Sequence, residues 1–312
     1  MLKPLIAIAG PTASGKTDVV LEMSRHLPLE AISCDSMQVY KRMPILTQVP
    51  APETQKKIPT HLVSFLEPEE EYNASLFRQA AQEIARTITG RKKIPVIVGG
   101  TGLYLRALLN GLFDAPSGIS DKNEALRQEL LAEEVRLGPG HLHQKLSSCD
   151  PSSAAKIHSR DLRRLVRALE VFILTGKPIS EQKKNRKGIR ADYATRLFFL
   201  NRNRADLYER INRRVEKMFK EGVVGEAQAL EGRVLSQTAQ MALGLREVQA
   251  YLKKERTLEE TKELIKKNTR NYAKRQLSWF RHEEGAEMVT IEKNDTPVII
   301  ASRILDAWES SQ

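Results

Sequence analysis

Eight consecutive residues near the N-terminus constrain the fold of this chain more than any other feature of its sequence. Residues 10–17 read Gly-Pro-Thr-Ala-Ser-Gly-Lys-Thr, with an apolar run at 5–9 before them and helical spacing at 18–27 after them. Glycines let the backbone bend until successive N–H groups face one phosphate, and the following helix N-terminus adds a favourable dipole. The segment, called the phosphate loop below, predicts a phosphate-binding turn between a first strand and a first helix.

The members of the phosphate loop have different expected roles. Lys16 supplies a point charge to the terminal phosphate, and the hydroxyl of Thr17 is a candidate ligand for Mg²⁺. The residues that we predict to bind the phosphates are Gly10, Thr12, Ala13, Ser14, Gly15, Lys16 and Thr17.

The loop does not by itself identify the phosphate compound. ATP is the usual occupant of such loops, so a small-molecule kinase is one reading. Nucleotide-hydrolysing P-loop enzymes commonly hold their metal with an aspartate that closes a second apolar strand. Here the apolar run at 94–98 is followed by Gly99-Gly100-Thr101 instead. This difference disfavours a kinase, but the identity of the bound phosphate compound remains open at this point.

Strand and helix patterns alternate from the N-terminus to residue 113, which predicts a parallel sheet with covering helices. Residues 114–195 then carry turn residues and helical periodicity, and strand character returns at 195–200. We predict an α/β fold, a P-loop NTPase-like parallel sheet core with an inserted all-helical domain. The core comprises residues 1–113 and 196–312, with a helical stretch at 204–281 and a last strand near 288–291, and the insertion comprises residues 114–195.

Basic residues exceed acidic ones by 50 to 39, which gives a formal net charge of +11. Such an excess favours a polyanionic partner. The two cysteines, Cys34 and Cys149, lack metal-ligand spacing, so we expect a reducing, cytoplasmic setting. The apolar runs are too short to cross a bilayer, so we expect no membrane association.

Basic residues recur at helical spacing on two predicted helices. One stripe, opposite an apolar side, comprises Arg160, Arg163, Arg164 and Arg167. The other, with Tyr272 and Trp279 nearby, comprises Lys267, Arg270, Lys274 and Arg281. Such stripes suit the phosphates of a folded RNA, although a single stripe is more often a solvated face. Two stripes in one basic chain favour RNA binding.

Several motifs, taken in order, resemble those of the bacterial tRNA dimethylallyltransferases along nearly the whole chain. The matching segments are Gly10–Thr17, Asp35–Tyr40, Gly99–Tyr104, Asp150-Pro151 through Ile157-His158, Arg167–Val171, Arg210–Val215, and Thr269–Gln276 with Trp279. The resemblance implies that the phosphate loop holds dimethylallyl diphosphate rather than ATP. It also implies that the acceptor is the exocyclic amine of the adenine just 3′ of the anticodon, in the tRNA anticodon stem-loop. We expect the protein to act as a monomer.

The resemblance also implies roles for individual residues. Asp35 follows a predicted strand and is a candidate to orient the amine or accept its proton, although it could also cap the next segment. Thr101 is a candidate contact to phosphate or substrate base, or a helix N-cap. Arg210 and Arg214, four residues apart on a helix, can reach one diphosphate. The predicted tRNA-binding residues are Asp35, Ser36, Met37, Gln38, Arg160, Asp161, Arg163, Arg164, Arg167, Lys274 and Arg275.

The chain departs from the family pattern at two places. It reads Leu46-Thr47-Gln48-Val49 where the family usually has Gly-Thr-Ala-Lys, and Ser159-Arg160 where Pro-Asn usually precedes Asp161. Besides the kinase, two alternatives remain: an adenylate prenyltransferase that acts on free AMP, and a non-catalytic RNA-binding module. The basic insertion disfavours the first of these, and the combination of Asp35 and Thr101 with the phosphate loop disfavours the second.

Overall fold

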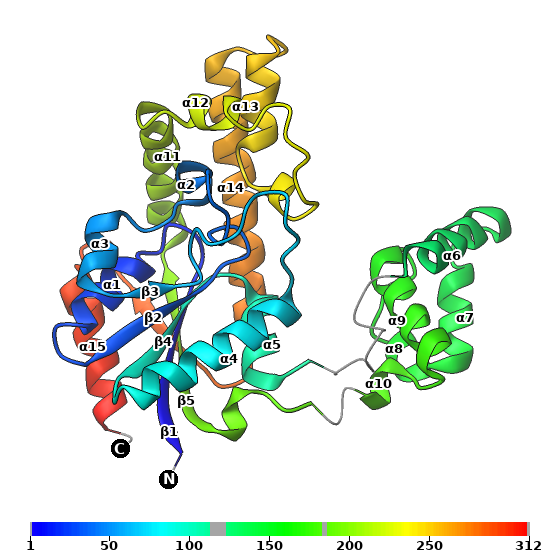
Figure 1. Ribbon diagram of the computed structural model, residues 1–312, viewed down its shortest axis with the longest axis horizontal. Coiled ribbons are helices and arrows are strands. Elements are labelled where there is room, and N and C mark those ends of the chain that lie inside the picture. The colour runs from blue at the N-terminus through cyan, green and yellow to red at the C-terminus, as the bar shows by residue number, and fades with distance from the viewer. Residues whose placement is uncertain (1, 113–122, 183–185, 311–312) are drawn as a thin grey trace. The chain divides into compact units, whose positions relative to one another are not determined.

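The computed structural model describes residues 2–112, 123–182 and 186–310 (Figure 1). The chain forms two compact units: a sheet unit, Met1–Leu109 with Ile189–Gln312, and a helical unit, Asn110–Gly188. The expected insertion began at residue 114, which lies outside the described residues. Its expected end at residue 195 is too late, because Tyr193 already pairs with Lys3 in the sheet. Polar and small residues at the start of that strand hide its period-two pattern from the sequence.

The described part of the sheet unit contains a six-stranded sheet with the order β3-β2-β4-β1-β5-β6. All neighbouring strands are parallel, which confirms the predicted fold class. The strands are β1 (Lys3–Ala9), β2 (Leu29–Cys34), β3 (Thr60–His61), β4 (Ile94–Gly99), β5 (Tyr193–Arg202) and β6 (Ala286–Ile291). The sequence analysis missed β3, because a two-residue strand has no periodicity to detect.

Helices cover both faces of the sheet, so its central strands are apolar on both sides. Successive residues of β1 alternate between two cores: Leu5 and Ala7 belong to one, and Ile6 and Ile8 to the other. The second core also contains residues of α1 (Lys16–Met23) and α15 (Pro297–Glu309). The first contains residues of α4 (Ala74–Gly90), α5 (Gly102–Asn110), α11 (Arg204–Lys220) and α14 (Leu258–Phe280).

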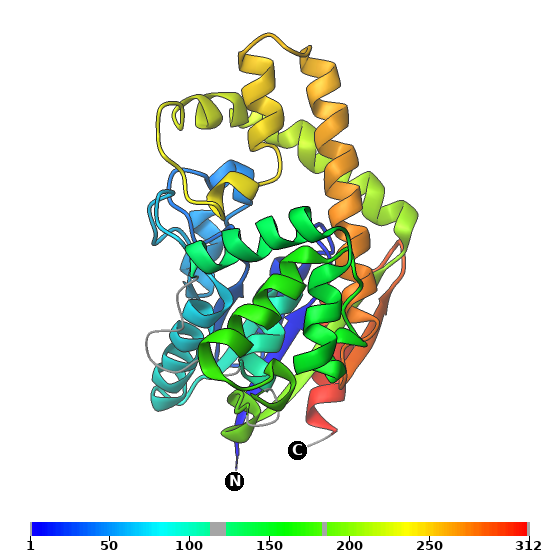
Figure 2. The same ribbon diagram turned by 90° about the vertical axis from the view of Figure 1, so that its right-hand side faces the viewer.

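The helical stretch predicted at 204–281 is more interrupted in the structure than the sequence indicated. Besides α11 and α14, it contains α12 (Val223–Gln228), the short η3 (Ala239–Met241) and α13 (Leu245–Leu252), with a non-helical segment before η3. Helix α15 was not predicted. Two short helices, α2 (Pro44–Thr47) and α3 (Pro52–Lys57), follow β2. Helices α11 and α14 pack against each other, and both views show them side by side (Figures 1 and 2).

The regular elements described in the helical unit are helices. They are α6 (Glu124–Leu137), α7 (His141–Cys149), α8 (Pro151–Ala154), α9 (Leu162–Thr175) and α10 (Ile179–Gln182). Leu130, Leu142, Leu146, Leu165 and Leu169 form the centre of their shared core. The unit therefore has an apolar core of its own, as a compact folding unit requires.

A buried carboxylate links the helices of this unit. Glu170 is fully buried and accepts two hydrogen bonds of 2.7 Å from Arg127 and one of 2.6 Å from Arg167. The backbone N–H of Asn123 donates a fourth, at 2.9 Å. Burial alone would raise the pKa of the Glu170 carboxyl, but the hydrogen bonds from Arg127 and Arg167 outweigh it and lower that pKa to about 2. Arg167, a predicted RNA contact, is therefore also an ion-pair partner of a buried carboxylate.

Replacing Glu170 with Gln should destabilise the helical unit by about 3–5 kcal/mol, because two arginines would be left beside a neutral group. The folded-state pKa of Glu170 lies below its ordinary value of 4.5, so its stabilisation is present above pH 4.5 and is lost towards pH 2. Hydrogen exchange of amides in α6 and α9, measured on the full chain, should show faster exchange in Glu170→Gln. The exposed-site variant Glu124→Gln is the control, and equal protection in both variants would contradict the assignment.

Candidate functional site

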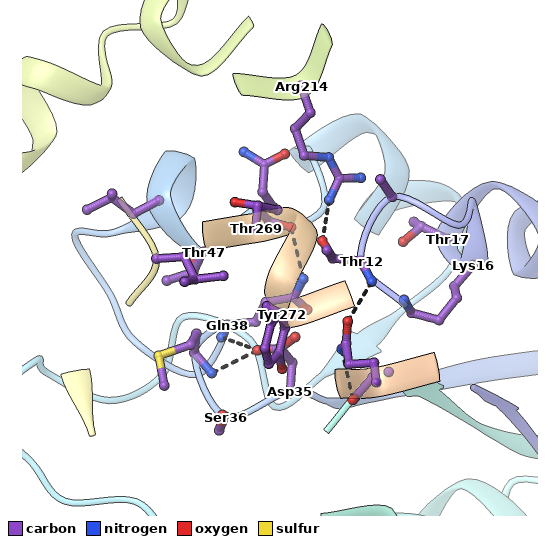
Figure 3. Close-up of a pocket in the computed structure, with 18 of the residues that line it drawn as sticks. Thr12, Lys16, Thr17, Asp35, Ser36, Gln38, Thr47, Arg214, Thr269 and Tyr272 are labelled. Carbon is purple, nitrogen blue, oxygen red and sulfur yellow. Dashed lines mark hydrogen bonds between the residues drawn. The ribbon is translucent and has the colours of Figure 1, made fainter. Parts of the chain in front are cut away.

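A pocket of about 470 Å³ opens at the carboxyl ends of β1, β2 and β4 (Figure 3). Ligands of parallel α/β sheets characteristically bind at this edge. Segments far apart in the sequence form its walls, among them the phosphate loop, the turn that begins at Asp35, and the facing sides of α11 and α14. The pocket lies entirely within the sheet unit.

The phosphate loop presents only some of its residues to the pocket. Gly15 adopts a left-handed conformation with φ of 96°, which places it in the turn that starts α1. The predicted phosphate-binding residues that line the pocket are Thr12, Ala13, Gly15, Lys16 and Thr17. Gly10 and Ser14 instead pack beneath the loop: Ser14 is fully buried, and a Cβ at position 10 would lie 2.8 Å from its Oγ.

Lys16 is held by the backbone of its own loop. Its Nζ donates hydrogen bonds of 2.9 Å to the carbonyl oxygens of both Gly10 and Pro11. Burial, with a smaller effect from the nearby Arg214 charge, lowers the pKa of Lys16 to about 8. The ammonium group is thus positioned at the loop while its charge is not cancelled by a carboxylate contact.

The two arginines predicted to bind diphosphate converge on the same loop. Arg210 Nε donates to the carbonyl of Ala13 at 2.9 Å, and Arg214 Nη1 donates to Thr12 Oγ1 at 3.0 Å. Both line the pocket. Burial lowers the pKa of Arg214, and the neighbouring Arg210 charge adds to this effect. An anion bound here would relieve the repulsion between these cations.

A third arginine at this loop was missed by the sequence analysis. Arg202, at the end of β5, is almost fully buried; its Nε donates to the Ser14 carbonyl at 3.4 Å and its Nη1 lies 2.5 Å from Asp206 Oδ2. It does not line the pocket but supports the loop from behind. The sequence signal for this residue was an arginine at the carboxyl end of an apolar strand. In a parallel sheet, that end lies at the same edge as the end of β1 and the phosphate loop that follows it.

Asp35 caps the turn that it begins, and it also lines the pocket. Its Oδ1 accepts the backbone N–H groups of Met37 at 2.8 Å and Gln38 at 3.3 Å, so the carboxylate does cap the turn. Within the described residues, its Oδ2 receives no protein hydrogen bond and remains available in the pocket. Burial raises the pKa of Asp35, while the two amides and the Lys16 charge partly offset that rise. A carboxylate with a raised pKa is a better proton acceptor.

Gln38 is engaged in holding the pocket wall. Its Oε1 accepts from Ser33 Oγ at 2.8 Å, and its Nε2 donates to the Gln48 carbonyl at 2.9 Å. Gln38, Ser36 and Met37 all line the pocket, as predicted substrate-facing residues would. In this structure, however, the Gln38 side chain links Ser33 of β2 to the backbone of Gln48.

Thr101 does not line the pocket, but it supports the residues that do. Its Oγ1 accepts the backbone N–H of Ser36 at 3.3 Å and hydrogen-bonds the hydroxyl of Tyr272. Figure 3 shows Tyr272 beside Asp35. The two readings of Thr101 as substrate contact and as helix cap therefore gain a third, in which it braces the Asp35 turn.

Gln276 lines the pocket and was not predicted as a site residue. Its Oε1 accepts the N–H of Thr12 at 2.9 Å, and its Nε2 donates to the Gly100 carbonyl at 2.9 Å. A Cβ at Gly100 would lie 2.2 Å from that Nε2 and 2.8 Å from the backbone oxygen of Gly10, so a side chain there would displace both the glutamine and the phosphate loop. Tyr272 and Gln276 lie in the motif 269–276, but only the basic residues of that motif attracted a prediction.

The predicted RNA-binding residues lie in both units. In the helical unit Arg160, Arg163 and Arg164 are exposed, and Asp161 caps α9 and pairs with Arg164 at 2.5 Å. In the sheet unit, Lys274 and Arg275 are exposed on α14, and Arg275 also lines the pocket.

Two oxygen groups at the start of α1 suit a magnesium ion. The Thr17 hydroxyl and the Asp18 carboxylate line the pocket next to Lys16. Mg²⁺ prefers oxygen ligands and is commonly held by one or two protein groups together with substrate phosphates. Within the described ranges, no cluster of three or more His, Cys, Asp or Glu residues forms a separate metal cage. The residues present therefore fit a metal shared with a bound phosphate.

The parallel sheet, the phosphate loop and the basic pocket define a P-loop protein with a site for a phosphorylated ligand. The family model described as IPP transferase matches residues 38–283, and the chain belongs to this family. The tRNA dimethylallyltransferase of Natranaerobius thermophilus is 40% identical over 308 residues, covering 97% of this chain and 91% of the relative. That of Carboxydothermus hydrogenoformans is 42% identical over 286 residues, covering 91% and 90%.

Solved structures agree with this assignment. A tRNA isopentenylpyrophosphate transferase from Bacillus halodurans matches with a TM-score of 0.69 and 36% identity, covering 99% of this chain and 97% of that chain. A eukaryotic dimethylallyltransferase acting on tRNA matches with a TM-score of 0.84 and 29% identity, covering 99% and 80%. Among the described residues, no helix is long and apolar enough to cross a membrane.

Inorganic diphosphate should bind less tightly as the pH rises through about 8, because Lys16 then loses the proton that attracts the anion. Above that pKa the loss should approach about tenfold per pH unit. Calorimetry on both sides of pH 8 measures the affinity for diphosphate. Because diphosphate itself titrates in this range, the affinity of Lys16→Met at each pH serves as the reference. The ratio of wild-type to variant affinity should shrink with rising pH, and a constant ratio would contradict this assignment.

Proposed function

We propose that this protein transfers a dimethylallyl group from dimethylallyl diphosphate to the N6 amine of the adenosine next to the 3′ side of a tRNA anticodon. The observation that carries the proposal is one pocket that joins a cationic diphosphate cradle to a carboxylate with a raised pKa. The names of the curated relatives support the reaction, and the basic side chains on both units support a folded RNA as acceptor.

The proposed reaction forms one bond and breaks one. The N6 nitrogen attacks C1 of the prenyl group while the bond between C1 and the bridging oxygen breaks, and that electron pair leaves with the diphosphate. An adenine amine is a weak nucleophile because its lone pair is delocalised into the ring. Asp35 Oδ2 accepts the N6 proton as the new bond forms, which restores a neutral amine in the product.

The leaving group gains negative charge in the transition state, so positioned cations lower the barrier. Lys16, Arg210 and Arg214 supply this charge from fixed positions around the loop. Thr17 and Asp18 are the residues that would hold Mg²⁺, which, when bound, adds further stabilisation of negative charge on the diphosphate.

The acceptor adenine must leave its stack to reach a pocket of this kind. We propose that phosphates of the anticodon stem-loop contact the exposed arginines of the helical unit and the α14 residues Lys274 and Arg275. We also propose that the protein acts as a monomer. The expected place of action is the cytoplasm, because the proposed acceptor is tRNA.

One assay separates this function from the kinase and AMP prenyltransferase alternatives. The protein is incubated with labelled dimethylallyl diphosphate and, separately, labelled ATP, each with tRNA or AMP as acceptor. Label transferred from dimethylallyl diphosphate to tRNA is the expected result. Turnover of ATP with no use of dimethylallyl diphosphate, or transfer to AMP alone, would overturn the proposal.

Asp35→Asn should lower turnover by about 10²–10⁴-fold, because an amide cannot accept the N6 proton. The amide oxygen can still accept the Met37 and Gln38 N–H groups, so the turn and the affinity for tRNA should change little. Single-turnover transfer rates and tRNA binding are measured in parallel. Near-normal turnover would reduce Asp35 to a structural cap.

Replacing Arg163 and Arg164 with Gln should weaken tRNA binding and reduce its salt dependence by up to about two units of log affinity against log salt. Arg167 is left intact, because its contact with buried Glu170 would confound any triple variant. The control replaces two exposed arginines of the sheet unit, Arg25 and Arg86, with Gln. An unchanged salt slope in the Arg163/Arg164 variant would mean that this stripe is a solvated face.

A further inference from the structure

Trp279 is an exposed aromatic side chain that the proposed reaction does not use. It lies on α14 near the basic stripe of that helix, and 36% of the residue is exposed. Trp279 is one turn beyond Arg275, so the two side chains lie on the same side of α14. Because Arg275 lines the pocket, Trp279 lies on the surface that continues from the pocket along the helix.

The indole of Trp279 rests against α5. The guanidinium carbon of Arg106 lies over the indole, 4.4 Å from the ring centroid. A Cβ placed on Gly102 would lie 2.3 Å from Trp279 Nε1, 2.4 Å from Cδ1 and 2.7 Å from Cε2, so only a residue without a side chain admits the ring there. A point this close to three consecutive ring atoms lies over the face of the indole rather than beyond its edge.

Both contacts from α5 fall on the same face of the indole. Gly102 and Arg106 are four residues apart, so they lie on one side of α5, one turn from each other. The exposed part of Trp279 therefore comes from the opposite face and the ring edges. The result is a flat aromatic surface, Trp279 backed by Gly102 and Arg106, which is called the indole plate below.

The cation behind the indole plate is paired with a buried carboxylate. Arg106 donates to Glu283 Oε2 from Nε at 3.0 Å and from Nη2 at 2.5 Å, and the Glu283 side chain is 4% exposed. This pair holds the guanidinium against the ring and matches its charge. The plate therefore offers a ligand an aromatic surface rather than a free charge, and such a surface binds other flat rings by stacking.

An unpaired nucleobase fits this surface. Single-stranded RNA is bound by aromatic side chains that stack on its bases, beside basic residues such as the exposed Lys274 and Arg275. Trp279 follows Tyr272, which lies beside Asp35 in Figure 3, by seven residues, or roughly 10 Å along the helix axis. Stacked bases are only about 3.4 Å apart. A base on the plate is therefore one that has separated from an adenine at Asp35.

We propose that the indole plate stacks on an unpaired anticodon-loop base directly next to the displaced adenine. The inference rests on the proposed function and adds a surface of the sheet unit that binds a base of the acceptor rather than its phosphates. Displacing the adenine uncovers a face of each neighbouring base, and stacking on Trp279 offsets part of that cost. The plate thus holds the neighbour while the adenine occupies the pocket.

The first test measures the affinity of a synthetic anticodon stem-loop RNA across a salt series. In Trp279→Ala the affinity should fall by about 5–150-fold, as expected for one base stacked on an aromatic ring. The salt slope should not change, because no phosphate contact is lost. Trp279→Phe keeps a ring and should bind more tightly than Trp279→Ala. The control Phe65→Ala removes an aromatic side chain of similar exposure, 40%, that is not among the described pocket-lining residues, and should bind as wild type does.

A second comparison identifies the stacked base. Two further stem-loops each lack one of the bases that flank the adenine. At the stacked position, loss of the base should weaken binding to wild type by a factor similar to that of Trp279→Ala, and should not weaken binding to that variant further. Independent effects of the variant and of the missing base at both flanking positions would overturn the proposal.

Tryptophan emission adds a readout that general damage to the fold does not mimic. The chain contains two tryptophans, and Trp308 in α15 is only 4% exposed, so quenching by bound RNA reports on Trp279. The intact stem-loop should quench the emission of wild type and leave that of Trp279→Phe unchanged. If Trp279→Ala fails to fold, this comparison still decides the inference.

The outcomes distinguish this inference from the proposed function. Wild-type protein that neither binds the stem-loop nor prenylates tRNA refutes the function and this inference with it. Wild-type protein that prenylates tRNA, with equal stem-loop affinity in Trp279→Ala or with no quenching of its emission, refutes the indole plate alone. A smaller salt slope in Trp279→Ala would assign the loss of affinity to a phosphate contact and would also overturn the stacking role.

Discussion

The site depends on cations that are held in place by neutral groups. Lys16 donates to the carbonyls of Gly10 and Pro11, and Arg210 donates to that of Ala13. Carbonyl dipoles fix the direction of a cationic side chain without cancelling its charge, as a carboxylate partner would. The positive potential at the loop is therefore preserved for a ligand, while Asp206 takes up the charge of Arg202, which only supports the loop.

Helix α14 connects the phosphate loop to the other walls of the pocket. Its residues Ile265, Thr269, Tyr272 and Gln276 all line the pocket and lie on one face of the helix. Gln276 ties the phosphate loop to the end of β4, and Tyr272 contacts Thr101, which in turn holds the Asp35 turn. One helix therefore links the phosphate loop to the turn that carries the Asp35 carboxylate. A capping box formed by Thr257 and Glu260 secures the start of this 23-residue helix.

Local patterns in the sequence were sufficient for five of the six described strands and for the phosphate loop. The phosphate loop is read from contiguous residues, and Asp35 was found because a strand ends just before it. Gln276 could not be assigned in this way, because its partner Thr12 is 264 residues away and the pairing exists only in the folded chain. The ion pair of Arg167 escaped prediction for a related reason. Helical spacing identified a basic face, but it could not reveal that Arg167 shares the buried Glu170 carboxylate with Arg127.

The electrostatics of the pocket also couple the proposed binding of the donor to the pKa values of Asp35 and Lys16. In the free protein the Lys16 charge lowers the pKa of Asp35, against the larger effect of burial. The negative charge of a diphosphate bound at the loop would offset the positive charge of Lys16, which keeps its proton. The lowering effect of Lys16 on Asp35 would then disappear, and the pKa of Asp35 would rise further. The carboxylate then becomes a stronger proton acceptor when the donor is already in place. The same anion raises the pKa of Lys16, because it stabilises the charged ammonium against burial. In the proposed reaction, donor binding would therefore let Lys16 keep its proton beside the leaving group and would make Asp35 a stronger base for the incoming amine.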